Sequence, residues 1–137
     1  MPPVLTDIIP VLVCSDIAAE HDFLVSVLGF TSAGLERTPA GAVVHAEVRT
    51  GDRRIWLHVS SQTARLEPPS ILGAAGGGLV VYVTDVDAHF AQVKASGAEI
   101  LSEPAAQPYG QREYGVRDPE GHCWWFATPT AGPAASA

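Results

Sequence analysis

Two tryptophans occupy matching places in the two halves of this chain, and their side chains are suited to binding flat organic molecules. Trp56 lies in GDRRIWLHVSS and Trp125 in DPEGHCWWFATP, so each follows a turn within a short apolar stretch. An indole stacks on aromatic rings and attracts cations to its face. If the two stretches are equivalent strands of a repeated unit, both indoles face one cavity and would bind a flat or bulky ligand. The alternative is that both rings fill the core.

The chain contains five histidines, and one of them is a candidate for the same cavity. His58 lies two residues beyond Trp56, so it shares the strand face of that tryptophan. There it could hydrogen-bond a ligand, act as a general base in a metal-free enzyme, or only pack. An atypical metal site built from His45, Glu47 and His58 remains an alternative. The other histidines are expected outside the cavity, two on helices and one facing solvent: His21, His89 and His122.

Composition and charge exclude several classes of function. The formal net charge of −7 argues against nucleic-acid binding, which requires a basic surface. Besides keeping the protein soluble, this charge favours cationic ligands. The chain has no apolar run of about 18 residues and no signal-peptide pattern, so we expect a cytoplasmic protein without a membrane partner. Cys14 and Cys123 fall in predicted strands and are expected to be reduced and buried, although a disulfide stays open.

The order strand, helix and three strands occurs twice along the chain, and such internal repetition indicates two copies of one unit. Asp16 and Asp85 are predicted to cap the two helices, and Gly29 and Gly97 to end them. A hairpin is predicted at Gly51-Asp52. The predicted strands are residues 8–14, 30–37, 42–50, 53–60, 79–84, 98–102, 111–117 and 122–128. The expected organisation is a first module over residues 1–60, a Pro/Gly-rich linker over 61–78, a second module over 79–128 and a disordered tail over 129–137.

Strand alternation assigns each residue to one of two faces. The side chains predicted to face the helices are Ile55, Leu57, Val59, Leu79, Val81, Val83, Trp124 and Phe126. Those predicted to face the cavity are Ile9, Val11, Val13, Trp56, His58, Val80, Tyr82, Cys123, Trp125 and Ala127. This second face is apolar and aromatic, which is typical of small-molecule pockets. Tyr109 lies in a Pro-containing loop that is expected to form a rim over the pocket. The DPEG segment over residues 118–121 fits a type I turn and needs no functional role.

The double βαβββ pattern resembles the vicinal oxygen chelate superfamily, which includes glyoxalase I, ring-cleaving dioxygenases and bleomycin resistance proteins. The resemblance covers about residues 5–128. Its most specific block is PYGQREYGVRDPEGHCWWFATP, and IPVLVCSDIAAEHDFLVSVLGF and DRRIWLHVS are also similar to the bleomycin resistance branch. The resemblance implies an α+β fold of two tandem βαβββ modules that form curled mixed sheets around a cup, with the helices on the outer face. The cup can form within one chain or across a dimer.

The metalloenzymes of that superfamily carry ligands on the first and last strands of each unit. The resemblance places these positions at Ile9, Trp56, Gly78 and Trp125, and none of these side chains can coordinate a metal. It therefore implies a metal-free binding protein without a cofactor or catalytic residue. As a homodimer, this protein would sequester a bulky aromatic or cationic compound such as an antibiotic. The expected ligand-binding residues are Trp56, His58, Tyr82, Tyr109 and Trp125. The alternative is a metal-dependent enzyme, either a glyoxalase-like lyase or a dioxygenase.

Overall fold

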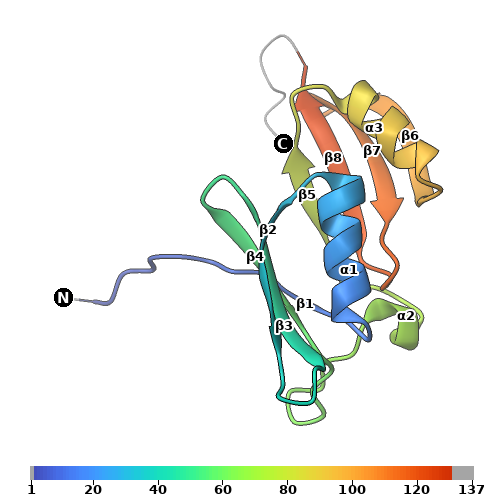
Figure 1. Ribbon diagram of the computed structural model, residues 1–137. Coiled ribbons are helices and arrows are strands. Elements are labelled where there is room, and N and C mark those ends of the chain that lie inside the picture. The colour runs from blue at the N-terminus through green and yellow to red at the C-terminus, as the bar shows by residue number, and fades with distance from the viewer. Residues whose placement is uncertain (1, 131–137) are drawn as a thin grey trace.

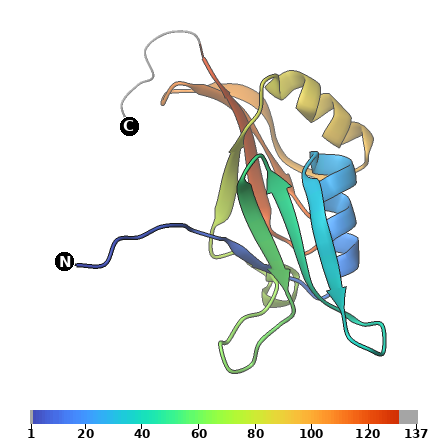
Figure 2. The same ribbon diagram turned by 60° about the vertical axis from the view of Figure 1, so that its left-hand side comes forward.

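The computed structural model describes residues 2–130, which form two four-stranded mixed sheets with helices on one common side (Figures 1 and 2). The first sheet contains β1 (Val11–Val13), β2 (Thr31–Arg37), β3 (Val43–Thr50) and β4 (Arg53–His58). The second contains β5 (Gly78–Tyr82), β6 (Glu99–Gln107), β7 (Gln111–Arg117) and β8 (Cys123–Pro129). The helices are α1 (Ile17–Phe23), which continues as a π-helical turn over Leu24–Leu28, α2 (Pro69–Leu72) and α3 (Val86–Ala95). This is the α+β architecture of two modules that the sequence predicts.

The two sheets repeat the same topology and the same register. Their strand orders are β1-β4-β3-β2 and β5-β8-β7-β6. In the first sheet β1 runs parallel to β4, and in the second β5 runs parallel to β8. Trp56 lies between Val11 and Glu47 on the neighbouring strands. Trp125 lies between Val80 and Gly115 in the same way. The repeat is therefore preserved down to individual residues, and the two tryptophans occupy equivalent positions.

Local sequence signals set the ends of several elements. The side chains of Asp16 and Asp85 each accept a hydrogen bond from a backbone amide three residues later, at 3.1 Å, so both predicted helix caps are confirmed. Gly29 ends the first helical segment with a φ of +97°, a conformation that favours glycine. Thr50 pairs with Arg53 across the two-residue turn between them, which confirms the predicted hairpin.

Both modules contribute to one hydrophobic core, which lies between the sheets and the helices. Leu57, Trp124 and Phe126 are at most 1% exposed, as strand alternation predicts. The rings of Phe30 and Trp124 contact each other across the two modules, with centroids 5.5 Å apart. The prediction for Val59 was wrong: it is 45% exposed because β4 ends one residue earlier.

The segments outside the sheets show three further features. The residues before β1 extend away from the body of the molecule and expose Val4, Leu5 and Ile8 (Figure 2). The Pro/Gly-rich stretch between the sheets contains the short helix α2. Of the predicted tail, Pro129 ends β8 and the Thr130 amide donates to Gly110, whereas residues 131–137 lie outside the described part of the chain. Over residues 2–130, no helix is both long and apolar enough to cross a bilayer.

Candidate functional site

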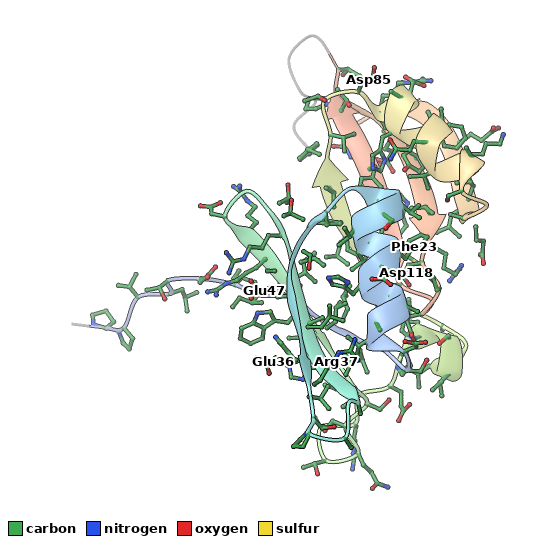
Figure 3. All side chains as sticks on the ribbon, viewed as in Figure 1. Phe23, Glu36, Arg37, Glu47, Asp85 and Asp118 are labelled. Carbon is green, nitrogen blue, oxygen red and sulfur yellow. The ribbon has the colours of Figure 1, made fainter. Side chains whose placement is uncertain are left out.

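The side of each sheet that is turned away from the helices is called its open face here. On the first open face the Trp56 indole donates a hydrogen bond through Nε1 to Glu47 Oε1 at 2.8 Å. The His45 ring meets the same indole edge-on, with centroids 5.4 Å apart. Glu47 lies on the side of its sheet away from α1 (Figure 3). Trp56 and His58 are both half-buried, so the neighbouring side chains fix these rings while part of each stays accessible.

His45 and His58 form a hydrogen-bonded pair, in which His45 Nδ1 lies 2.9 Å from His58 Nε2. Glu47 also accepts a hydrogen bond from Arg49 at 2.5 Å. The hydrogen bonds from Trp56 and then Arg49 hold the pKa of the Glu47 carboxyl below its ordinary value. Among residues 2–130, His45, Glu47 and His58 do not form a cluster of potential metal ligands. In residues 2–130, such a cluster occurs at another place in the fold.

On the second open face the Trp125 indole lies across the sheet. A Cβ atom added at Gly78 on β5 would approach its Cζ3 to 2.4 Å, and one added at Gly115 on β7 would approach its Nε1 to 3.1 Å. The ring therefore occupies the space that these two glycines leave on the strands at either side of β8. Within the described residues, no group accepts a hydrogen bond from Trp125 Nε1, and the residue is half-buried.

A chain of hydrogen bonds joins the two predicted tyrosines, Tyr82 and Tyr109. Tyr82 donates to Gln111 Oε1 at 2.9 Å, and Gln111 Nε2 donates to Glu113 Oε1 at 2.9 Å. The Tyr109 hydroxyl donates to the same Glu113 oxygen, and this bond raises the pKa of Tyr109. Tyr82 on β5 and Trp125 on β8 belong to one sheet, and Tyr109 lies in the turn between β6 and β7 of the same sheet. Two polar residues that the sequence did not single out as ligand contacts, Gln111 and Glu113, position the tyrosines.

The five predicted residues do not line one common cavity in a single chain. Trp56 and His58 lie on the first open face, Tyr82 and Trp125 lie on the second, and Tyr109 lies in the turn between β6 and β7. A groove of about 1090 Å³ runs between the modules, along the N-terminal segment, the β3–β4 hairpin and β5. Of the five residues only Tyr82 lines it, together with Leu5, Ile8, Arg54 and Leu79.

The metal of the superfamily's enzymes does not fit these faces. The positions that would hold its ligands carry Ile9, Trp56, Gly78 and Trp125, and an indole nitrogen is a donor without a lone pair to share. The Nε1 atom of Trp56 is moreover hydrogen-bonded to Glu47. At the two tryptophan positions the open faces therefore offer aromatic surface in place of metal-binding groups.

A buried polar network on the helix side was missed by sequence reasoning. Glu120 in the DPEG turn is 4% exposed, and its carboxylate accepts hydrogen bonds from the backbone amides of Ser15 and Asp16, both at 2.8 Å. Asp118 is equally buried and accepts a hydrogen bond from Trp124 Nε1 at 2.8 Å. The turn bond from Gly121 N to Asp118 O is present at 3.0 Å. The segment is therefore a turn, as predicted, and it also joins the second module to the start of α1.

The same region holds three groups with potential metal-ligand atoms. Cys14 and Glu20 are buried, and His122 donates through Nε2 to the Val13 carbonyl at 2.8 Å, so the prediction that His122 faces solvent was wrong. Burial, followed by the neighbouring Asp118 carboxylate, raises the pKa of Glu20 to about 11. Burial also raises the pKa of the Cys14 thiol. Both cysteines are free, Cys14 buried as predicted and Cys123 half-buried.

The sequence did contain a signal for Glu20. It lies three residues after Ile17 and four before Leu24, on the apolar stripe of the first helix. A carboxyl group at such a position faces the core, and the structure shows it 0% exposed. A polar residue at an apolar position of a helix is thus the pattern that would have identified this network.

Comparisons with known proteins agree with the fold and with the binding-protein branch. The sequence profile described as Glyoxalase/Bleomycin resistance protein/Dioxygenase superfamily matches residues 8–126. The uncharacterised protein Rv0887c of Mycobacterium tuberculosis is 30% identical over 123 residues, which cover 88% of this chain and 72% of that protein. The structure of TioX from Micromonospora sp. ML1 is similar with a TM-score of 0.69 and 33% identity, covering 90% of this chain and 98% of TioX.

A second solved structure is that of the bleomycin-binding protein from Streptomyces verticillus, in complex with copper(II)-bleomycin. It has a TM-score of 0.62 and 28% identity, and the match covers 97% of this chain and 100% of that protein. The profile match spans both βαβββ modules and confirms the resemblance drawn from their motifs. The chain therefore belongs to the Glyoxalase/Bleomycin resistance protein/Dioxygenase superfamily.

Proposed function

We propose that the protein binds and sequesters a bulky aromatic or cationic organic compound, such as an antibiotic, and that its open faces do this without a metal. The observation that carries the proposal is the Trp125 indole, which lies across the second open face on Gly78 and Gly115. A half-buried ring held in this way presents a rigid stacking surface with little entropy to lose on binding. Trp56 provides a second indole at the equivalent register of the other sheet.

Two carboxylates beside the aromatic groups favour a cationic ligand. Glu47 contacts Trp56, and Glu113 contacts Tyr109. A cation over an indole face gains about 0.5–2 kcal/mol, and the net charge of −7 adds a long-range attraction. The similarity to the bleomycin-binding protein of Streptomyces verticillus supports the same class of ligand, because that protein was crystallised with copper(II)-bleomycin.

We further infer that the protein acts as a homodimer in the cytoplasm. The N-terminal segment exposes Val4, Leu5 and Ile8 by 80%, 94% and 83%, and such apolar surface is costly in a monomer. A second copy that covers this segment could bring a first open face opposite a second one and enclose a ligand between them. The free thiols of Cys14 and Cys123 fit a reducing compartment.

A fluorescence titration tests the binding proposal. The chain has three tryptophans, and Trp124 is 0% exposed whereas Trp56 and Trp125 lie on the open faces. We expect saturable quenching by compounds from a panel of cationic aromatic antibiotics that includes bleomycin. Trp125→Phe and Trp56→Phe should each reduce the quenching amplitude and the affinity. A panel that produces no saturable change, or quenching that survives in the double variant, contradicts the proposal.

A further inference from the structure

Three side chains of different chemistry meet on the helix side of the molecule, away from the open faces. Cys14 follows β1, Glu20 lies on α1, and His122 precedes β8. One potential ligand atom from each residue lies within 4.8 Å of the other two. The first two residues belong to one module and the third belongs to the other, so the cluster lies where the modules join.

Glu20 shows that this cluster is incomplete. Its side chain is 0% exposed, and both of its carboxyl oxygens are without a hydrogen-bond donor in the described part of the chain. A buried carboxyl group that lacks partners is strongly disfavoured, so native proteins pair such groups or let them coordinate a metal. The charged groups that act on Cys14 are all carboxylates, namely Glu20, Glu120, Asp118 and Asp16. A cation would therefore be stabilised at this place.

The donor set identifies the cation. A thiolate, an imidazole and a carboxylate together suit Zn²⁺, which takes sulfur, nitrogen and oxygen ligands in tetrahedral geometry. Ligand atoms around a tetrahedral zinc lie roughly 3.5 Å apart, so the side chains need to move by only about an ångström. His122 already donates Nε2–H to the Val13 carbonyl, which leaves Nδ1 with its lone pair. This is the outer hydrogen bond that orients a metal-binding histidine.

We propose that Cys14, Glu20 and His122 bind one zinc ion, which joins the two modules. A water molecule completes the fourth position. The site is separate from the open faces, so it goes beyond the proposed ligand binding. Its test does not depend on whether the open faces bind a ligand. A zinc ion here stabilises the fold, because binding to the native state alone shifts the unfolding equilibrium.

Cobalt substitution tests the site directly. Metal-free full-length protein is titrated with Co²⁺, and we expect a thiolate-to-cobalt charge-transfer band in the near ultraviolet that saturates at one equivalent and disappears when Zn²⁺ is added. Cys14→Ser should abolish the band, and Glu20→Gln should weaken Co²⁺ binding at least tenfold. Cys123→Ser is the matched control, because this second free thiol lies on an open face and its loss should leave the band unchanged. A band that survives in Cys14→Ser, or no band at all, overturns the proposal.

Thermal unfolding provides a second readout that does not require the cobalt spectrum. Excess Zn²⁺ should raise the melting temperature of the unmodified protein by about 5 °C or more over protein in chelator, and should leave that of His122→Ala unchanged. If zinc raises both melting temperatures equally, it binds elsewhere and the assigned site is wrong. If zinc raises neither melting temperature, zinc does not bind at this place and the proposal is wrong. Glu20 then remains protonated beside Asp118.

Discussion

The carboxylate of Glu120 accepts hydrogen bonds from both the backbone amide and the hydroxyl of Ser15, at 2.8 and 2.9 Å, across 105 positions of sequence. The Asp16 amide donates to the other carboxylate oxygen. Helices begin with amide groups that lack partners inside the helix, and a negative charge there also meets the positive end of the helix dipole. The second module thus provides a cap for the first helix of the other module.

Removing this carboxylate should destabilise the protein. Glu120→Ala removes the acceptor of part-buried, charge-assisted hydrogen bonds from the Ser15 and Asp16 amides, and we expect the free energy of unfolding to fall by about 2–3 kcal/mol in a denaturant titration. Glu120→Gln keeps an acceptor oxygen and should cost less. Glu103→Ala is the control, since Glu103 belongs to an exposed pair with Lys94 at 3.7 Å and should cost under about 1 kcal/mol. Equal losses for Glu120→Ala and Glu103→Ala would show that the cap contributes little.

A second prediction concerns Gly78, one of the two glycines against which the Trp125 indole packs. A methyl group at Gly78 would meet the indole at 2.4 Å and the Cys123 carbonyl at 2.6 Å, so Gly78→Ala must displace the ring and should cost about 1–3 kcal/mol. The tryptophan emission spectrum should change, and ligand affinity should fall. Gly76→Ala is the matched control because no atom lies within 4 Å of the added group. If both variants behave alike in stability and emission, the ring does not occupy this position.

Much of the fold follows from local patterns in the sequence. Alternation places Trp124 in the core and Trp125 on the opposite face, and the two adjacent tryptophans are indeed fully buried and half-buried. The caps at Asp16 and Asp85 were also predictable, because a helix cap depends on residues three positions apart. These features require no knowledge of distant contacts.

Glu20 provides a third prediction, which concerns pH. In metal-free protein its folded pKa is raised from 4.5 to about 11, so at pH 7 the folded state keeps a proton that the unfolded state loses. The part of its cost that depends on pH is therefore absent below about pH 4.5, and it grows as pH rises from there toward 11. In chelator, Glu20→Met should raise the free energy of unfolding by up to about 3 kcal/mol at pH 7, with a gain that shrinks toward pH 4.5.

The charged groups that face Glu20 are Asp118 and Glu120 of the second module. Denaturant titrations of both proteins at several pH values give the difference directly. A Glu20→Met variant that is less stable than the parent at every pH would mean that the carboxyl group has a partner in the native protein. With saturating Zn²⁺ the parent protein should become more stable than Glu20→Met, since only the parent can then bind the metal.

The buried network could not be predicted in the same way as the caps. The hydrogen bonds from Ser15 to Glu120 and from His122 to Val13 join residues more than 100 positions apart, and no local pattern encodes which distant groups meet. The DPEG turn was predicted as a turn because Asp, Pro and Gly have turn preferences. The glutamate in it has no such preference, and its role emerges only when the two modules pack together.

The three indole N–H groups report most directly on the central claim that Trp56 and Trp125 bind an organic ligand. In a ¹⁵N–¹H correlation spectrum each indole gives its own signal, and Trp124, buried and bonded to Asp118, serves as an internal reference. On titration with a cationic aromatic antibiotic that quenches fluorescence, the Trp56 and Trp125 signals should shift saturably while the Trp124 signal stays in place. A ligand that binds and moves neither of the two open-face signals would contradict the account.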